Sequence, residues 1–178
     1  MTRFVALFRG INVGKAKRIA MADLRALLQT LGYTEVHTLL NSGNAVFNAA
    51  EGTALQHARD IQAAVAKTLG VDALVIVKSA KEMDAIVAGN SLSEIATDPS
   101  RLLVAMTQGA RALVHLKKMA DTDWDVEDLH LGQHAAYLWC ADGILESKVA
   151  ALLLKDLTHT GTTRNWATLE KIQALMAA

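Results

Sequence analysis

The sequence has one cysteine, few aromatic residues and no net charge, and the first and last of these features each argue against a class of protein. A single cysteine permits no intrachain disulfide, which excludes the disulfide-rich secreted scaffolds. Lysines and arginines number 18, as do aspartates and glutamates, so the chain has no broad positive surface to capture nucleic acid or an anionic membrane.

Long hydrophobic runs are also absent. None approaches the roughly 18 residues that a membrane span needs. The apolar run at residues 4–8 is too short for the apolar region of a signal peptide, and no cleavage-like site follows it. These absences predict a cytoplasmic protein with no membrane contact.

The composition that remains is typical of a folded globular protein. Apolar residues make up 52% and charged residues 20%, which excludes disorder. A chain of this length buries about 70% of the surface that it exposes when unfolded, enough for one large core or two small ones.

The first half alternates strand and helix patterns. Short apolar runs predict strands, and apolar residues spaced by three and four predict helices that end at Gly32 and Gly70. The resulting order, strand-helix-strand-strand-helix-strand, is that of the ferredoxin-like fold. The predicted strands are residues 4–8, 36–40, 45–48 and 73–77, and the helices lie within 21–31 and 55–69.

The second half partly repeats this order after a break. Residues 79–82 are a capping box that opens a short helix ending at Gly89, and residues 90–100 hold the only proline and predict a linker. We therefore predict an α+β protein with two ferredoxin-like subdomains, 1–89 and 101–178. Later predictions are strands at 102–107, 126–131 and 135–140, helices at 110–119 and 144–157, a polar connection at 158–165 and a C-terminal helix.

A glycine-rich segment, Arg9–Gly14, follows the first strand and precedes the basic residues 15–18. It is not a nucleotide P-loop, because three residues instead of four separate its glycines and Ala16 follows the lysine. Two interpretations stay open. In the first, its backbone N–H groups and a nearby cation (Arg9, Lys15 or Lys17) bind an anion. In the second, its glycines only allow positive φ, and the side chain of Asn12 forms hydrogen bonds with backbone groups of the loop.

Two further polar segments accompany this loop. Asn41–Asn44 is strong hairpin-turn chemistry, and pairing of the first and third strands should place Asn44 close to Arg9. Residues 162–166 precede the last helix, where Thr163 or Asn165 is a candidate N-cap and Arg164 adds charge. We hypothesise that this segment folds back on the other two to complete one cleft. The alternative is a simple cap with a tryptophan packed in the core.

Several segments together resemble a known family: RGINVG followed by MADLRALLQTLGY, then NSGNAVF, DGILESK and TTRNWATLEKI. They resemble the bacterial family catalogued as domain of unknown function 1697. The resemblance implies two ferredoxin-like subdomains and no particular reaction. The polar positions that it implies are Arg9, Gly10, Asn12, Gly14, Ser42, Gly43, Asn44, Lys148, Arg164, Asn165 and Trp166.

This chain departs from the family pattern at three positions. Lys15 stands where the family usually has a second glycine, Lys17 replaces a polar residue, and Ala20 stands where a proline is common. The two lysines either loosen the fit of the loop around a ligand or strengthen an anion site.

Other chemistry has weaker support. Phe4, Phe8 and Phe47 lie on strands where an RNA-recognition module carries stacking aromatics, but such residues are more often core. The histidine pair His130 and His134 lacks a third metal ligand. Ser42 has no evident general base, and Cys140 is expected to be a buried side chain. The sequence thus predicts no cofactor and no metal, and it leaves catalysis and oligomeric state open.

The leading hypothesis is a small anionic or phosphorylated ligand bound in a cleft. Arg9, Lys148 and Arg164 would supply charge, while the side chains of residues 12, 42 and 44 would orient the ligand. The alternative is a nucleic-acid or protein-interaction module that uses the sheet face. A third possibility is that the loops are purely structural.

Overall fold

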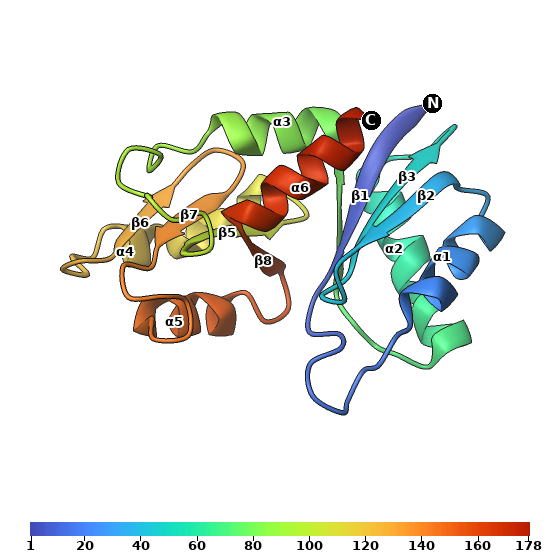
Figure 1. Cartoon of the computed structure of the whole chain (residues 1–178), viewed down its shortest axis with the longest axis horizontal. Helices are drawn as coiled ribbons and strands as arrows, with labels where there is room; N and C mark the ends of the chain where they lie inside the picture. The colour runs from blue at the N-terminus through green and yellow to red at the C-terminus, as the bar shows by residue number, and fades with distance from the viewer. The chain divides into compact units, whose positions relative to one another are not determined.

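The computed structural model describes all 178 residues, and the chain forms two compact units (Figure 1). The first comprises residues 1–81 with 172–178, and the second comprises residues 82–171. Each unit contains one four-stranded antiparallel sheet. None of the helices has both the length and the apolar character that crossing a membrane requires. The linker predicted at residues 90–100 stays a prediction.

The first unit has the predicted ferredoxin-like order, with its strands arranged β2-β3-β1-β4. Helices α1 and α2 lie on the same face of this sheet (Figure 1). Its elements are β1 (Thr2–Phe8), α1 (Met21–Thr30), β2 (Thr34–Leu39), β3 (Asn44–Ala49), α2 (Ala54–Ala64), the π-helical turn η1 (Val65–Leu69) and β4 (Val75–Ser79).

The central strand β1 explains why the core of this unit forms where it does. Alternate side chains of a strand point to opposite faces, and Phe4, Ala6 and Phe8 join the core shared with the two helices. Helix α1 contributes Leu24 and Leu28, both fully buried, at the i, i+4 spacing of one helical face. Burying each such leucine stabilises the fold by about 1.5–3 kcal/mol.

The second unit repeats the fold, with strand order β6-β7-β5-β8. The predicted architecture of two ferredoxin-like folds with a C-terminal helix is therefore confirmed, while the subdomain bounds 1–89 and 101–178 stay predictions. Its elements are α3 (Ala80–Ala88, which begins in the first unit), β5 (Leu102–Thr107), the 3₁₀ helix η2 (Ala110–Leu116), α4 (Lys117–Ala120), β6 (Asp128–Leu131), β7 (Ala136–Trp139), α5 (Lys148–Asp156), β8 (Gly161–Asn165) and α6 (Trp166–Ala177, which ends in the first unit).

The prediction of a polar connection at 158–165 was wrong, because residues 161–165 form the fourth strand of this sheet. Strand β8 pairs with β5 from Leu103↔Asn165 to Thr107↔Gly161. Gly161 permits the close pairing, since a Cβ there would lie 2.6 Å from the carbonyl oxygen of Met106. The strand carries almost no aliphatic side chains, so the apolar signal of a strand is missing from its sequence.

Two predicted helices differ from expectation, one in its type and one in its start. The helix predicted at 110–119 is a 3₁₀ segment followed by the four-residue α4. The helix predicted from residue 144 begins at Lys148, because Ser147 is its N-cap and its Oγ accepts a hydrogen bond from the Ala150 N–H at 2.9 Å.

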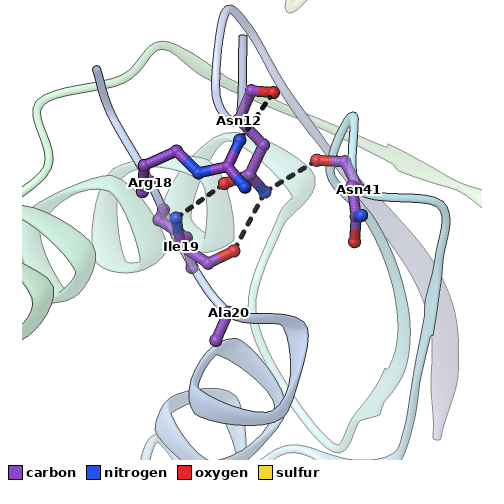
Figure 2. Close-up of a pocket in the computed structure, with 5 residues that line it drawn as sticks. All are labelled: Asn12, Arg18, Ile19, Ala20 and Asn41. Atoms are coloured by element: carbon purple, nitrogen blue, oxygen red, sulfur yellow. Dashed lines mark hydrogen bonds between the residues drawn. The ribbon is translucent and has the colours of Figure 1, made fainter. Parts of the chain in front are cut away.

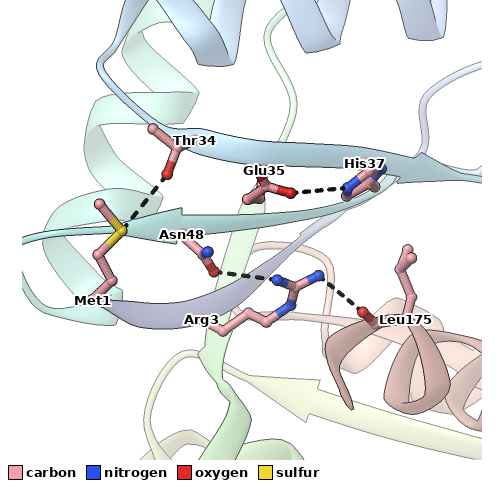
Figure 3. A network of polar contacts seen from close by, with 7 residues as sticks. All are labelled: Met1, Arg3, Thr34, Glu35, His37, Asn48 and Leu175. Atoms are coloured by element: carbon pink, nitrogen blue, oxygen red, sulfur yellow. Dashed lines mark hydrogen bonds and ion pairs between the residues drawn. The ribbon is translucent and has the colours of Figure 1, made fainter. Parts of the chain in front are cut away.

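An arginine near the start of the chain holds the C-terminal turn of α6 (Figure 3). Arg3 Nη2 donates to the Leu175 carbonyl oxygen at 3.0 Å, and Nη1 donates to Asn48 Oδ1 at 3.4 Å. The last carbonyls of a helix lack intrahelical partners and carry partial negative charge, so a guanidinium there is favourable. Arg3 thereby attaches the end of the chain to the β1–β3 pair.

We expect Arg3→Met to destabilise the protein by about 1–2 kcal/mol, because it removes the charged donor from the end of α6 while retaining an apolar stem. Arg3→Lys is the matched variant that keeps the charge and should lose less. The free energy of unfolding in urea is the measurement, and equal stability of Arg3→Met and wild type would contradict the role.

A buried histidine connects three elements of the same unit. Tyr33 Oη and His57 Nδ1 form a 2.9 Å hydrogen bond, and the imidazole packs edge-on against Phe4 and Phe47, with ring centroids 4.7 and 5.7 Å away. Burial lowers the pKa of His57 from its ordinary value of 6.5, and this outweighs the opposing charge of Asp60. The folded chain thus resists protonation at this ring.

Stability should therefore fall as the pH drops below about 6.5. Above that pH the ring is neutral in both states, whereas below it the unfolded chain binds a proton that the folded chain resists. Urea unfolding of wild type and His57→Gln at about pH 7.5 and about pH 5.5 measures this effect. Wild type should lose more stability than the variant over this range, and equal losses would show that His57 does not contribute.

Candidate functional site

The loop between β1 and α1, residues 9–20, owes its path to four residues with positive φ. These angles are 67° at Gly10, 56° at Asn12, 63° at Gly14 and 52° at Lys17. Glycine adopts this conformation without cost and asparagine with little. No protein atom lies within 4 Å of a Cβ added at Gly10 or Gly14, so both glycines serve the backbone conformation and border open space.

The side chain of Asn12 holds this loop together and joins it to its neighbour (Figure 2). Its Nδ2 donates to the carbonyl oxygens of Ile19, at 2.9 Å, and Asn41, at 2.8 Å, while its Oδ1 accepts from the Ile19 N–H at 2.8 Å. Both amide N–H bonds are thus used within the protein. Asn12 satisfies loop backbone, which is one of the two roles predicted for it.

The hairpin of residues 40–43, which connects β2 to β3, meets this loop at one end of the sheet. The Phe8 N–H donates to the Gly43 carbonyl oxygen at 2.9 Å, and Leu7 is the Cα partner of Asn44. Gly43 is needed there, because a Cβ would lie 2.6 Å from Ile11 Cδ1. The predicted proximity of the two loops is confirmed.

The buried side chain of Asn44 stabilises the hairpin through hydrogen bonds. Its side chain is fully buried, and Nδ2 donates to the Leu39 carbonyl oxygen at 2.8 Å and to Ser42 Oγ at 3.3 Å. Both of its N–H bonds are therefore engaged, as they are in Asn12. Asn12 and Asn44 thus stabilise the two loops that meet at this end of the sheet.

A pocket of about 280 Å³ lies where the two loops meet (Figure 2). Arg18 folds back over its own loop, and its Nη1 donates to the carbonyl oxygens of Asn12, at 3.1 Å, and Gly14, at 3.3 Å. Its Nε and Nη2 make no hydrogen bond within the protein. The pocket is lined by Asn12, Arg18, Ile19, Ala20 and Asn41.

Helix α1 begins at the edge of this pocket without a side-chain cap. Its N-cap is Ala20, whose side chain cannot accept a hydrogen bond from the first-turn N–H groups. Asp23 is the one acid in that turn. The uncapped N–H groups give the start of the helix a partial positive charge that favours an anion, and Asp23 offsets part of this charge.

Among the other predicted residues of the first unit, Arg9 does not line the pocket. Its N–H donates to the Leu74 carbonyl oxygen at 2.9 Å, and partial burial lowers the pKa of its guanidinium. Ser42 belongs to the hairpin through its contact with Asn44. The structure thus brings together Gly10, Asn12, Gly14, Ser42, Gly43 and Asn44 at one end of the first sheet.

Lys148, Arg164 and Asn165 belong to the second unit. Lys148 is the exposed first residue of α5. Arg164 is 8% exposed on β8, where its Nη1 donates to Thr162 Oγ1 at 2.9 Å and to the Thr163 carbonyl oxygen at 2.8 Å, and burial lowers its pKa to about 10. Asn165 Oδ1 accepts from the Thr168 N–H at 2.9 Å, which confirms it as a cap of α6.

The residue that the sequence did not single out is Arg18. Arg9, Lys15 and Lys17 were the predicted sources of charge, and residue 18 was only part of a basic run. Which basic residue turns back over the loop depends on the left-handed conformations at Gly14 and Lys17. The sequence gives no sign that Lys17, rather than a neighbouring residue, adopts the left-handed conformation.

The other residues considered as functional candidates are explained by their roles in the folded core. Phe4, Phe8 and Phe47 are at most 4% exposed and belong to the core, so none presents a ring for base stacking. Cys140 is fully buried and its pKa is raised to about 11, mainly by burial, which keeps the thiol protonated. No group of three or more His, Cys, Asp or Glu side chains is arranged to hold a metal ion.

Comparison with known proteins places the chain in a family. A family model described as protein of unknown function (DUF1697) matches residues 1–137. The chain belongs to the DUF1697 family. A solved structure similar to this DUF1697 protein is that of the conserved bacterial protein SP0830 from Streptococcus pneumoniae, with a TM-score of 0.81, 24% identity and 98% of each chain covered. That likeness supports the fold alone. No curated protein matches the chain.

The bridging role of Asn12 in this DUF1697 protein is testable by two alanine substitutions. Asn12→Ala removes three hydrogen bonds and should cost about 2 kcal/mol of unfolding free energy. Asn41→Ala is the control, because Asn41 contributes only its main-chain carbonyl, and it should cost less than about 0.5 kcal/mol. Urea denaturation of both variants measures the difference, and similar losses would mean that the Asn12 side chain does not support the loop.

Proposed function

We propose that this DUF1697 protein is a cytoplasmic protein that binds a small anionic or phosphorylated ligand in the pocket between residues 9–20 and the 40–43 hairpin. The observation that carries the proposal is Arg18, whose guanidinium lines the pocket and has two nitrogens without a partner. A guanidinium fork is well suited to bidentate contact with phosphate or carboxylate oxygens.

The charges around the pocket support an anion over a cation. Lys15, Lys17 and Arg18 lie on the loop, all exposed, against the single acid Asp23 in the first turn of α1. The protein as a whole carries no net charge. The excess of positive charge is therefore local to this loop, which favours a small ligand over an extended polyanion.

Backbone groups would add to this attraction. The first N–H groups of α1 have no side-chain cap, and helix starts of this kind favour negative charge by about 0.3–1 kcal/mol at an exposed position. Gly10 and Gly14 leave the space beside the loop open, so a ligand can approach its backbone. Asn12 would shape the pocket without contacting the ligand through its amide N–H groups, and the buried Asn44 would hold the neighbouring hairpin.

The sequence also assigned Lys148, Arg164 and Asn165 to the ligand site. That assignment stays a prediction, because these residues belong to the second unit, whereas the pocket is formed by the first alone. The proposal is one of binding, and it includes no reaction.

The proposal predicts that inorganic phosphate binds in isothermal titration calorimetry at low ionic strength. Arg18→Gln should weaken binding about tenfold, because it removes the charged donor. Arg111→Gln removes the same charge from an exposed residue of the second unit and should leave binding unchanged. Equal losses in the two variants, or no binding to wild type, would contradict the proposed site.

A further inference from the structure

A second pocket lies in the first unit, at the start of helix α2. Its volume is about 450 Å³, within the range of about 300 to 1,000 Å³ that is usual for small-molecule sites. It shares no lining residue with the pocket at Arg18. The residues that line it are Glu51, Gly52, Gln56, His57, Arg59 and Asp60.

His57 is the one buried residue of this lining. It is 5% exposed, and its Nε2 has no hydrogen-bond partner, although Nδ1 is bonded to Tyr33 Oη. The main chain of Glu51 favours a proton on the ring, but no group completes a hydrogen bond of normal geometry with Nε2. A buried polar atom without a partner costs about 1–3 kcal/mol, so folding alone does not explain why it is there.

The contact with Tyr33 decides which nitrogen of His57 carries the proton. Burial is the main cause that raises the pKa of Tyr33 to about 12, so its hydroxyl keeps its hydrogen at neutral pH. If Tyr33 donates that hydrogen to Nδ1, only the Nε2–H group stays without a partner. The opposite tautomer would leave two groups unsatisfied, the tyrosine hydrogen and the Nε2 lone pair. We therefore assign Nε2 as a donor that lacks an acceptor.

Gly52 is the pocket residue that lies against this donor. Its φ is 99°, and a Cβ there would lie 2.7 Å from Cε1 and 2.9 Å from Nε2 of the imidazole. Any other residue would therefore collide with the ring. Residues 51–53 are exposed, and glycine has no side chain to displace, so a shift of main chain alone opens Nε2 to the pocket.

The exposed part of the pocket carries charges of both signs. Arg59 supplies a guanidinium, whereas Glu51 and Asp60 supply carboxylates, and none of the three forms an ion pair within the protein. An anion alone would leave both carboxylates unmatched. A cation alone would leave the guanidinium and the Nε2–H group of His57 unmatched. A ligand with one carboxylate and one ammonium group matches all of them.

We propose that this pocket binds a small zwitterion of the amino-acid type. Its carboxylate contacts Arg59 and the Nε2–H group of His57, and its ammonium group lies between the carboxylates of Glu51 and Asp60. Binding moves residue 52 away from the imidazole, so that the buried donor gains an acceptor. The site is independent of the proposed anion site at Arg18, and failure of either leaves the other standing.

The test titrates the full isotope-labelled chain with L-alanine and follows its ¹⁵N–¹H spectra. L-Alanine should cause saturable shifts in the amides of residues 51–60 and in the imidazole Nε2 signal of His57. Propionate lacks the ammonium group of L-alanine, and isopropylammonium lacks its carboxylate. Each should bind at least about tenfold more weakly, because each makes only one of the two charged contacts.

Two substitutions of exposed residues separate the roles of the two charges. Arg59→Gln should weaken binding of L-alanine about tenfold, because it removes the partner of the carboxylate. Asp60→Asn should weaken binding of L-alanine without weakening that of propionate, since it removes a partner of the ammonium group only. Arg111→Gln, at an exposed position of the second unit, is the matched control and should change neither affinity.

The outcomes are distinct. Saturable binding of L-alanine with a change at His57 Nε2 supports the site. No saturable shift with L-alanine overturns it. Propionate that binds as tightly as L-alanine would exclude a zwitterion, because the ammonium group would then contribute nothing. Shifts confined to the exposed residues, with the imidazole signals of His57 unchanged, would overturn the role of the buried donor.

Discussion

The candidate site depends on the side-chain amide of Asn12. Three hydrogen bonds of 2.8–2.9 Å fix Ile19 on one side and the carbonyl of Asn41 on the other, so a single residue closes the 9–20 loop and joins it to the hairpin. An amide is needed for this arrangement, because Nδ2 donates to two carbonyls while Oδ1 accepts from an N–H. An aspartate would place a charge against both carbonyl oxygens. The pocket exists because this bridge holds its two walls at contact distance.

The glycines that surround the bridge have two different functions. Gly43 allows the hairpin backbone to approach Phe8 and Ile11, where any side chain would collide. Gly10 and Gly14 have open space beside them and serve only the left-handed backbone. Mutation to alanine would therefore disturb the backbone conformation at all three positions and, at residue 43, the packing as well. Gly43, whose φ is also positive at 91°, therefore answers both a steric and a torsional constraint, whereas Gly10 and Gly14 answer a torsional one.

Much of the architecture was predictable, because periodicity and turn chemistry are local signals. The apolar run at 4–8, the leucines of α1 and the turn at 41–44 led to the correct topology, and antiparallel pairing then predicted that the two loops meet. Strand β8 was missed because its stability comes from pairing with β5 rather than from apolar side chains of its own. A similar fold at 24% identity, in the Streptococcus pneumoniae protein, agrees with an architecture that depends on few specific residues.

The site was predicted less completely than the fold. The sequence identified Asn12 and offered its backbone-satisfying role as one alternative, but it did not identify Arg18. The orientation of that side chain follows from left-handed turns at Gly14 and Lys17, and the latter is a conformation that lysine seldom adopts. Loop conformations of this kind are decided by tertiary contacts such as the Asn12 bridge, and residue order alone does not reveal them.

The central claim is that a small anion binds against Arg18 at the start of α1. The most direct measurement is a ¹⁵N–¹H correlation spectrum of the protein titrated with sodium phosphate, with sodium chloride at equal ionic strength as the reference. The account predicts saturable shifts concentrated in the amides of residues 12–23 and in the Arg18 Nε–H. Shifts that are absent, that match those caused by chloride, or that concentrate on amides far from this loop would contradict it.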